Sequence, residues 1–126
     1  MNGLNRVSLI GNVGQDPTIK ELENKNRVAN FSLATTVNYK DGSGETQQDT
    51  EWHNIVCWNQ LATIVETYVS KGDAIYVEGK IRYRKYENND GEKKYFTEII
   101  AQEVRVFHPK NPNKNGTNKT SNATTK

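Results

Sequence analysis

Apolar and polar residues alternate through most of the first 107 residues, which predicts a mostly β body. β-branched and aromatic residues recur in runs separated by turn-forming residues, as expected for strands. The polar stretch Lys40–Asp49 is expected to be a long flexible connection. An Asp-Gly pair supplies positive φ angles, so the sequence NNDG at Asn88–Gly91 predicts a hairpin turn. The five predicted strands are Leu4–Ile10, Arg27–Tyr39, Thr50–Trp58, Ala74–Tyr86 and Lys93–Phe107.

One segment between the third and fourth predicted strands has the spacing of an amphipathic helix. Its apolar residues follow the i, i+3, i+4, i+7, i+8 pattern and are Leu61, Ile64, Val65, Tyr68 and Val69. Gly72 is expected to stop this helix. Five strands with a helix between the third and the fourth are typical of the OB-fold, a small Greek-key barrel. The sequence therefore predicts an all-β, five-stranded OB-fold barrel with one helix.

Composition changes abruptly near the C-terminal end. Residues 109–126 contain five Asn, four Lys, four Thr and two Pro, and Ala123 is their only apolar residue. Such a segment has too little apolar surface to offset the entropy lost on ordering. We therefore predict a folded domain at residues 1–108 and a disordered Asn/Thr/Lys-rich tail at residues 109–126.

Charge and cysteine content narrow the class of protein. Residues 1–108 hold 13 basic and 15 acidic residues, because four of the 17 Lys/Arg lie in the tail. A histone-like protein that grips nucleic acid through overall positive charge is disfavoured, although a local basic stripe is compatible. A single cysteine, Cys57, excludes an internal disulfide framework and a multi-thiolate zinc site. With no apolar run of about 20 residues and no secretory pattern, we expect a soluble cytoplasmic protein.

None of the common catalytic or nucleotide-binding motifs is present in the sequence: it has no P-loop, no G-x-G-x-x-G and no G-x-S-x-G. His53 and His108 are too far apart in sequence to form a helical zinc pair. Cys57 lies in mid-strand beside Ile55, where a buried inert thiol is the favoured interpretation. We expect no enzymatic activity, no cofactor and no metal.

Aromatic and basic residues are distributed in an informative way. On the third predicted strand, Trp52 and Trp58 share a face with Asn54 and Val56. On the fourth, one face is apolar, and the other carries a basic stripe with aromatic residues at its ends. The outward residues of the fourth strand are Tyr76, Glu78, Lys80, Arg82, Arg84 and Tyr86, and Lys85 adds to the stripe.

Cations that follow phosphates and rings that stack on bases are what single-stranded nucleic acid requires. Two alternatives stay open at this point. Each tryptophan could be a core or subunit-interface residue, and the basic stripe could be a solvated edge that prevents aggregation. Because the aromatic rings and the basic stripe occur on one fold, we favour binding of single-stranded nucleic acid over these alternatives.

Six motifs resemble those of the single-stranded DNA-binding proteins of bacteria and mitochondria, over about residues 4–107. In sequence order they are NRVSLIGNVGQDP at 5–17, FSLAT at 31–35, TEWHNIV at 50–56, KGD at 71–73, YVEG at 76–79 and YFTE at 95–98. The resemblance implies an OB-fold homotetramer that wraps single-stranded DNA without sequence preference during replication, recombination and repair.

The resemblance also implies roles for individual residues. The base-stacking positions of the family fall on Tyr39, Trp52, Trp58 and Tyr86. The phosphate-contacting set, completed by Lys80 from the basic stripe, is Arg6, Lys71, Lys80, Arg82, Arg84, Lys85 and Lys94. His53 matches a position associated with subunit contacts, and Gln60 stands where relatives often have a lysine.

The end of the sequence departs from the family pattern. Bacterial relatives end in an acidic tip that recruits replication and repair proteins, whereas this sequence ends in Thr124-Thr-Lys126. Recruitment by that route is therefore in doubt. A phage- or plasmid-encoded protein, or a chain that has been shortened, is an alternative to a full-length chromosomal protein. Two rival functions stay open: an OB-fold module that binds protein or oligosaccharide, and a nuclease built on an OB barrel.

Overall fold

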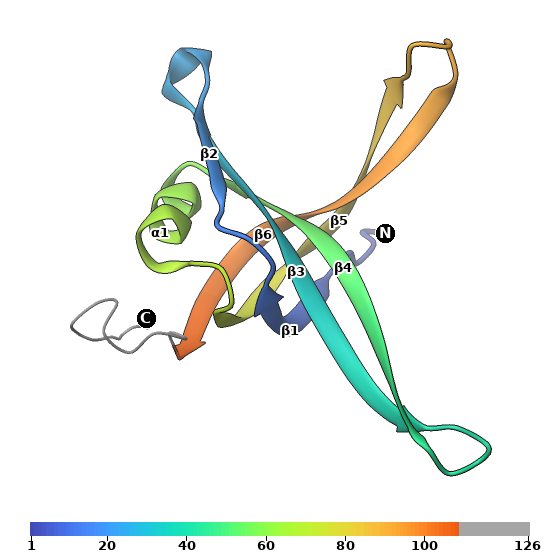
Figure 1. Ribbon diagram of the computed structural model, residues 1–126. Coiled ribbons are helices and arrows are strands. Elements are labelled where there is room, and N and C mark those ends of the chain that lie inside the picture. Colours follow the sequence, from blue (N-terminus) through green and yellow to red (C-terminus); the bar gives the residue numbers. More distant parts are fainter. Residues whose placement is uncertain (109–126) are drawn as a thin grey trace.

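Six strands and one α-helix make up the part of the chain that the computed structural model describes, residues 1–108 (Figure 1). The predicted disordered tail at 109–126 lies outside the described residues. The elements are β1 (Val7–Val13), β2 (Thr18–Glu21), the 3-10 turn η1 (Glu23–Lys25), β3 (Arg27–Lys40), β4 (Thr46–Trp58), α1 (Gln60–Tyr68), β5 (Ala74–Glu87) and β6 (Lys93–His108).

Five of the strands close into a barrel. They are hydrogen-bonded in the order β1-β5-β6-β4-β3, and β1 pairs back onto β3 to complete the ring. The β4–β6 pair is parallel, and the other pairs are antiparallel. A closed five-stranded barrel with its helix between β4 and β5 confirms the predicted OB-fold.

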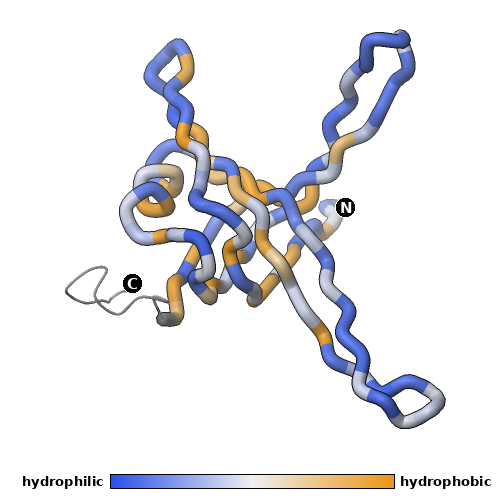
Figure 2. Tube along the Cα trace, in the orientation of Figure 1, coloured by the Kyte–Doolittle hydropathy of each residue, from blue (hydrophilic) through white to orange (hydrophobic). Residues whose placement is uncertain are grey.

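The core of the barrel consists of the inward residues of the alternating strands. Leu33, Ile55, Ile75 and Val77 are almost completely buried, and Val65 of α1 packs against the same cluster. Figure 2 shows the apolar positions where the strands cross and on α1, whereas the hairpins that project from the barrel are hydrophilic. The barrel is therefore stabilised by apolar burial, while the projecting hairpins are not.

Two of these projecting hairpins matter for function, and both are clear in Figure 1. The β3–β4 arm comprises residues 36–51 and extends to the lower right of the figure. The β5–β6 arm comprises residues 80–98 and extends to the upper right. The predicted turn at Asn88–Gly91 is confirmed, and Gly91 there has a φ of 80°.

The prediction of a long connection at Lys40–Asp49 is wrong. The β3–β4 ladder continues to the pair Lys40 and Thr46, so that only residues 41–45 form the loop. The strand residues here are polar and lack the apolar alternation that predicts a strand, because an arm that projects into water needs no apolar face. The loop is ordered by Asp41, whose Oδ1 accepts bonds from the N–H groups of Ser43 and Glu45, at 2.9 and 3.0 Å.

The structure also corrects the N-terminal third of the prediction. The first strand spans Val7–Val13 instead of Leu4–Ile10, and β2 was not predicted. β2 has only four residues and pairs with the start of β3. Arg27 links β2 to α1, because its guanidinium contacts Glu66 of α1 at 2.5 Å and Glu21 of β2 at 3.5 Å. The hydrogen bond with Glu66 is the main cause of a raised Arg27 pKa.

Gly72 does not stop the helix directly, contrary to the prediction. α1 ends at Tyr68, and the N–H of the extended residue Val69 still donates to the carbonyl of Val65, at 3.0 Å. Gly72 belongs to the turn that follows, where its φ is 89° and its N–H donates to the carbonyl of Val13, at 2.7 Å. This turn joins the helix end to the barrel.

Candidate nucleic-acid interface

The outward sides of β3, β4, β6 and β5 form one continuous surface, here called the binding face. Strand register places Ser32 opposite Asn54, Val56 beside Ile100, and Arg84 opposite Phe96. Because side chains alternate between the two sides of a strand, the outward residues of all four strands point away from the barrel core. A groove of about 360 Å³ opens on this face, with walls that include Gln15, Asn30, Asn54, Val56, Arg84 and Phe96.

Both tryptophans lie on the binding face with accessible rings. Trp52 is 61% exposed, and Trp58, at the end of β4, is 36% exposed. The Trp52 ring covers Gly14, where a Cβ would lie 2.5 Å from the ring atom Cζ3. Gly14 therefore makes room for the ring, and the other side of the Trp52 ring stays open to solvent.

Glu98 holds two arginines of β5 in place, and one of them, Arg84, lines the groove. The side chain of Glu98 is buried, with only 3% exposed, and its carboxylate accepts a 2.7 Å hydrogen bond from Nη2 of Arg82 and a 3.3 Å bond from Nε of Arg84. The guanidinium of Arg84 also lies 5.2 Å from the centre of the Phe96 ring. Both arginines keep about half of their side-chain surface exposed. Arg84 is thus a positioned cation that can still donate to a phosphate.

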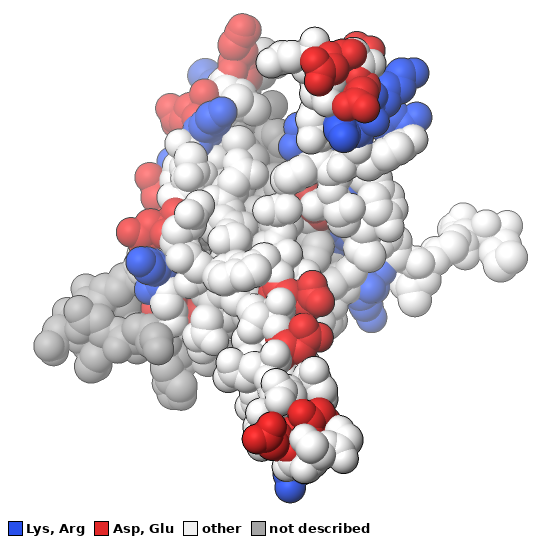
Figure 3. Space-filling model, turned by 45° about the vertical axis from the view of Figure 1, so that its right-hand side comes forward, with Lys and Arg blue, Asp and Glu red and all other residues white. Residues whose placement is uncertain are grey.

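The two arms differ in charge, as Figure 3 shows. The β3–β4 arm carries one lysine and four carboxylates, and acidic side chains follow it at the bottom of the figure. The β5–β6 arm carries six basic and four acidic residues, and its basic side chains gather at the top right. Phosphates are therefore attracted to the β5–β6 side of the binding face.

The other cationic residues of the predicted phosphate set are spread over several elements. Arg6, before β1, pairs with Glu78 at 3.5 Å, and Lys94 lies 3.8 Å from Glu92. Lys71 lies in the exposed turn after α1. Lys80 is exposed on the outward side of β5 and forms no ion pair within residues 1–108.

Alternation separates two predicted residues from the rest of the set. Lys85 is opposite Tyr95 and therefore on the other side of the β5–β6 arm from Arg84. Tyr39 is opposite Gln47 on the β3–β4 arm, on the side that Trp52 does not share. Tyr86, opposite Lys94, does share the side of Arg84. The outward sides of β4, β5 and β6 thus carry Trp52, Trp58, Lys80, Arg82, Arg84, Tyr86 and Lys94. Tyr39 and Lys85 lie on the opposite sides of their arms, and Arg6 and Lys71 lie outside the strands.

Two residues on the inward side of β4 complete the picture. His53 is half-buried, and its Nε2 lies 2.9 Å from Oγ1 of Thr35. Its role in subunit contacts stays a prediction. Cys57 is buried as predicted, and desolvation raises the pKa of its thiol to about 12. The thiol is therefore protonated, and inert, at neutral pH.

Sequence reasoning missed Phe96 and Glu98 as part of the site, although both lie in the motif YFTE. The signal was present, because a hairpin centred on residues 88–92 pairs Arg84 with Phe96 and Arg82 with Glu98. Among residues 1–108 we find no group of three or more potential metal ligands and no helix long and apolar enough to cross a membrane.

A five-stranded barrel that carries exposed aromatic rings and positioned arginines on its outward side is typical of nucleic-acid-binding OB-fold proteins. Comparison identifies the family: residues 4–107 match the model of the single-strand binding protein family, and the chain belongs to it. It is 48% identical over 112 residues to the single-stranded DNA-binding protein of Bacteroides thetaiotaomicron, covering 87% of this chain and 70% of that one. It is 44% identical over 109 residues to single-stranded DNA-binding protein 1 of Chlorobaculum tepidum, covering 86% and 67%.

A solved structure with a similar fold is that of the Plasmodium falciparum SSB in complex with ssDNA. It superposes with a TM-score of 0.80 at 35% sequence identity, and the match covers 86% of this chain and 98% of that one.

Proposed function

We propose that this protein binds and protects single-stranded DNA without sequence preference. The observation that carries the proposal is the groove itself, in which the positioned Arg84 faces polar and apolar residues of β3 and β4, with Trp52 and Trp58 exposed on the same face. The proposal is supported by the names of the similar bacterial proteins and by the DNA-bound state of the Plasmodium protein.

In this function the rings and the cations act on different parts of the nucleotide. Trp52, Trp58 and Tyr86 stack on unpaired bases, each stacked base contributing roughly 1–3 kcal/mol, and every base has a face to offer. Lys80, Arg82, Arg84 and Lys94 neutralise phosphates, which releases counterions. A duplex hides its base faces, so the same surface discriminates against double-stranded DNA.

The activity is binding, and the protein turns nothing over. It protects single-stranded DNA during replication, recombination and repair in the cytoplasm. It assembles as a homotetramer, in which His53 lies at a subunit contact. An oligosaccharide or protein ligand is the weaker candidate, because neither needs a cationic groove with buried support for its arginines. Replication and repair proteins are its expected partners.

A fluorescence titration with poly(dT), on protein whose mass in solution has been measured, tests the proposal. We expect quenching of tryptophan emission, an affinity that falls as salt rises, and little response to duplex DNA. Equal quenching by duplex DNA would contradict the proposal, and so would cleavage of a labelled oligonucleotide incubated with Mg²⁺ or Ca²⁺. An oligosaccharide array provides the control for the rival ligand.

A further inference from the structure

The loop between β1 and β2, residues 14–17, contributes to the binding face at two points. Gly14 lies against the ring of Trp52, and Gln15 is part of the groove wall. None of the four residues of this loop belongs to the hydrophobic core of the described chain. Hydrogen bonds therefore have to determine where the loop lies.

Two hydrogen bonds anchor the loop, one near each end. The N–H of Gly14 donates to the carbonyl of Ser32 on β3, at 2.9 Å. Oδ1 of Asp16 accepts from the N–H of Lys71, at 2.8 Å, across 55 positions of sequence. Pro17 restricts the backbone of Asp16 to extended conformations, which limits the directions in which this side chain can point.

The turn that donates to Asp16 is itself fixed to the barrel. The N–H of Gly72 donates to the carbonyl of Val13, at 2.7 Å, and the N–H of Val13 donates to the carbonyl of Asp73, at 2.9 Å. Asp73 is buried, and its Oδ2 accepts from the N–H of Ser70, at 2.9 Å. Lys71 lies between these residues and therefore presents its N–H from a fixed position.

A carboxylate beside a surface for phosphates calls for a physical reason. Asp16 is exposed and forms no ion pair within residues 1–108, so its negative charge repels the ligand of the proposed function. A carboxylate oxygen is, however, a strong acceptor for a backbone N–H. The hydrogen bond with Lys71 is the contact that accounts for an acidic residue at this position.

We propose that Asp16 is a positioning residue for single-stranded DNA binding. Its hydrogen bond with the N–H of Lys71 holds the β1–β2 loop, so that Gly14 supports the Trp52 ring in a stacking position. This role rests on the proposed function and adds to it a residue that does not itself touch the ligand.

Three variants of Asp16 separate the position of its oxygen from its charge. Asp16→Asn keeps the acceptor and removes the charge, Asp16→Glu keeps the charge and displaces the acceptor, and Asp16→Ala removes both. The ligand is a short dT oligomer, the shortest that gives full tryptophan quenching. Asp16→Glu and Asp16→Ala should bind it at least about fivefold more weakly, the lower limit for the loss of one stacked base. Asp16→Asn should bind it within about twofold of the unmodified protein, because the loop stays anchored.

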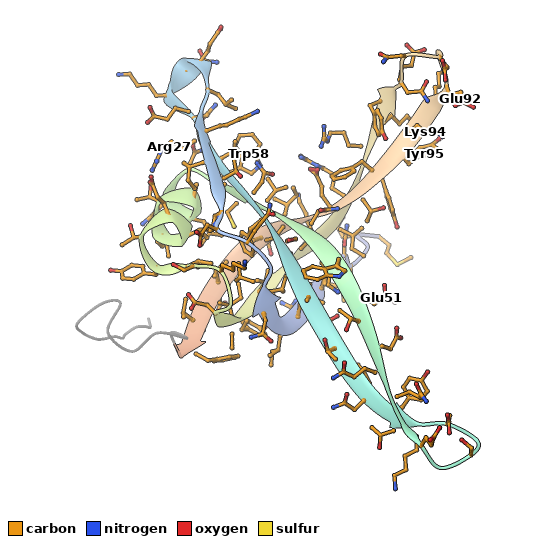
Figure 4. The ribbon with its side chains drawn as sticks, viewed as in Figure 1. Arg27, Glu51, Trp58, Glu92, Lys94 and Tyr95 are labelled. Carbon is orange, nitrogen blue, oxygen red and sulfur yellow. The ribbon has the colours of Figure 1, made fainter. Side chains whose placement is uncertain are left out.

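A double-mutant cycle tests whether Asp16 acts through Trp52. In a Trp52→Ala background, Asp16→Ala should weaken binding by no more than about twofold, because the ring that the loop supports is absent. Trp58 provides the matched control, and Figure 4 shows it at the end of β4, away from Glu51, which precedes Trp52 in the sequence. Six residues of a strand span about 20 Å, so Asp16→Ala should keep its full effect in a Trp58→Ala background.

Urea unfolding of each variant accompanies the titrations, and Asp16→Glu replaces Asp16→Ala in the cycle if the alanine variant does not fold. An equal loss of affinity in the two tryptophan backgrounds would overturn the proposal, because a general loss of stability acts on both alike. Unchanged binding by Asp16→Ala would overturn it too. So would the same change of affinity in Asp16→Asn and Asp16→Ala, since the position of the oxygen would then not matter. Absence of tryptophan quenching by any oligomer with the unmodified protein would instead refute the proposed function.

Discussion

The β3–β4 arm and the β5–β6 arm end in nearly the same turn but carry opposite charge. Residues 41–45 (DGSGE) and 88–92 (NNDGE) each close a five-residue loop with a glycine of positive φ at the fourth position. In each loop one side-chain oxygen, from Asp41 or Asn88, accepts bonds from the N–H groups two and four residues later. The net charge is −3 on the first arm and +2 on the second. Turn chemistry therefore builds the arms, and the strand residues decide what each arm can bind.

The largest expected effect comes from removing both arginines that hold the buried carboxylate of Glu98. Arg82→Ala/Arg84→Ala should lower the free energy of unfolding by about 2–3 kcal/mol, because it leaves a buried charge unpaired. The value is below that of a fully buried pair, since both arginines are half-exposed. Affinity for single-stranded DNA should fall at least about tenfold, since two phosphate contacts are lost. Urea unfolding and a DNA titration measure the two effects.

A control on the same strand distinguishes stability from binding. Lys80→Ala removes a cation that has no carboxylate partner among residues 1–108, so stability should change by less than about 0.5 kcal/mol. Adding Glu98→Gln to the double arginine variant should recover much of the lost stability but none of the binding. An unchanged unfolding curve for the double variant would show that Glu98 does not depend on the arginines.

Aromatic residues on the two arms should respond differently to ligand length. Tyr86→Ala, on the side of Arg84, should weaken binding of the short dT oligomer by about 1–3 kcal/mol. Tyr39→Ala should affect only long oligomers, because Tyr39 lies on the acidic arm and on the side opposite Trp52. Isothermal titration with both lengths provides the measurement. Equal losses with the short oligomer would mean that the DNA path includes both arms from the start.

Neutralising charges on the acidic arm should have a smaller effect of the opposite sign. Asp49→Asn/Glu51→Gln removes two negative charges and should tighten binding by no more than about threefold at low salt. The increase should vanish near 1 M salt, where the Debye length is about 3 Å. Lys80→Gln/Lys94→Gln on the other arm should weaken binding under the same conditions. Weaker binding after neutralisation of the acidic arm would show that its carboxylates support the ligand site.

Sequence reasoning succeeded where burial leaves a periodic trace. Alternation placed Ile75 and Val77 inside and both tryptophans of β4 on the face opposite Ile55, and the helix spacing placed α1 to within one residue at each end. It failed on the arms, because a strand in water keeps its ladder without an apolar pattern, as at Thr46–Asp49. It also grouped Lys85 with Arg84, although successive residues of a strand point to opposite sides.

Other parts of the site depend on contacts that one sequence does not reveal. The parallel β4–β6 pairing that brings Phe96 and Glu98 beside Asn54 joins strands separated by α1 and β5. Neither local strand propensity nor the register counted outward from a hairpin turn predicts such a pair. The pairing of Glu98 with two arginines was within reach, because the position of one turn determines the register of the whole β5–β6 hairpin.

The smallest expected effect is a difference between the two turns in how their stability depends on pH. Hydrogen bonds, first from the Ser43 hydroxyl and then from the Glu45 N–H, lower the pKa of Asp41 below its usual value of 3.8. Because the pKa of Asp41 is lower in the folded turn, its ionised carboxylate stabilises the turn at any pH above the usual Asp pKa. This stabilisation is lost as the pH falls through the lower folded-state pKa. The amide of Asn88 does not titrate, so acid should speed amide hydrogen exchange at Ser43 and Glu45, relative to intrinsic rates, but not at Asp90 and Glu92. Asp41→Asn should remove the difference and Asn88→Asp should create it in the other arm, whereas the same pH response in both turns would assign the effect to acid unfolding of the barrel.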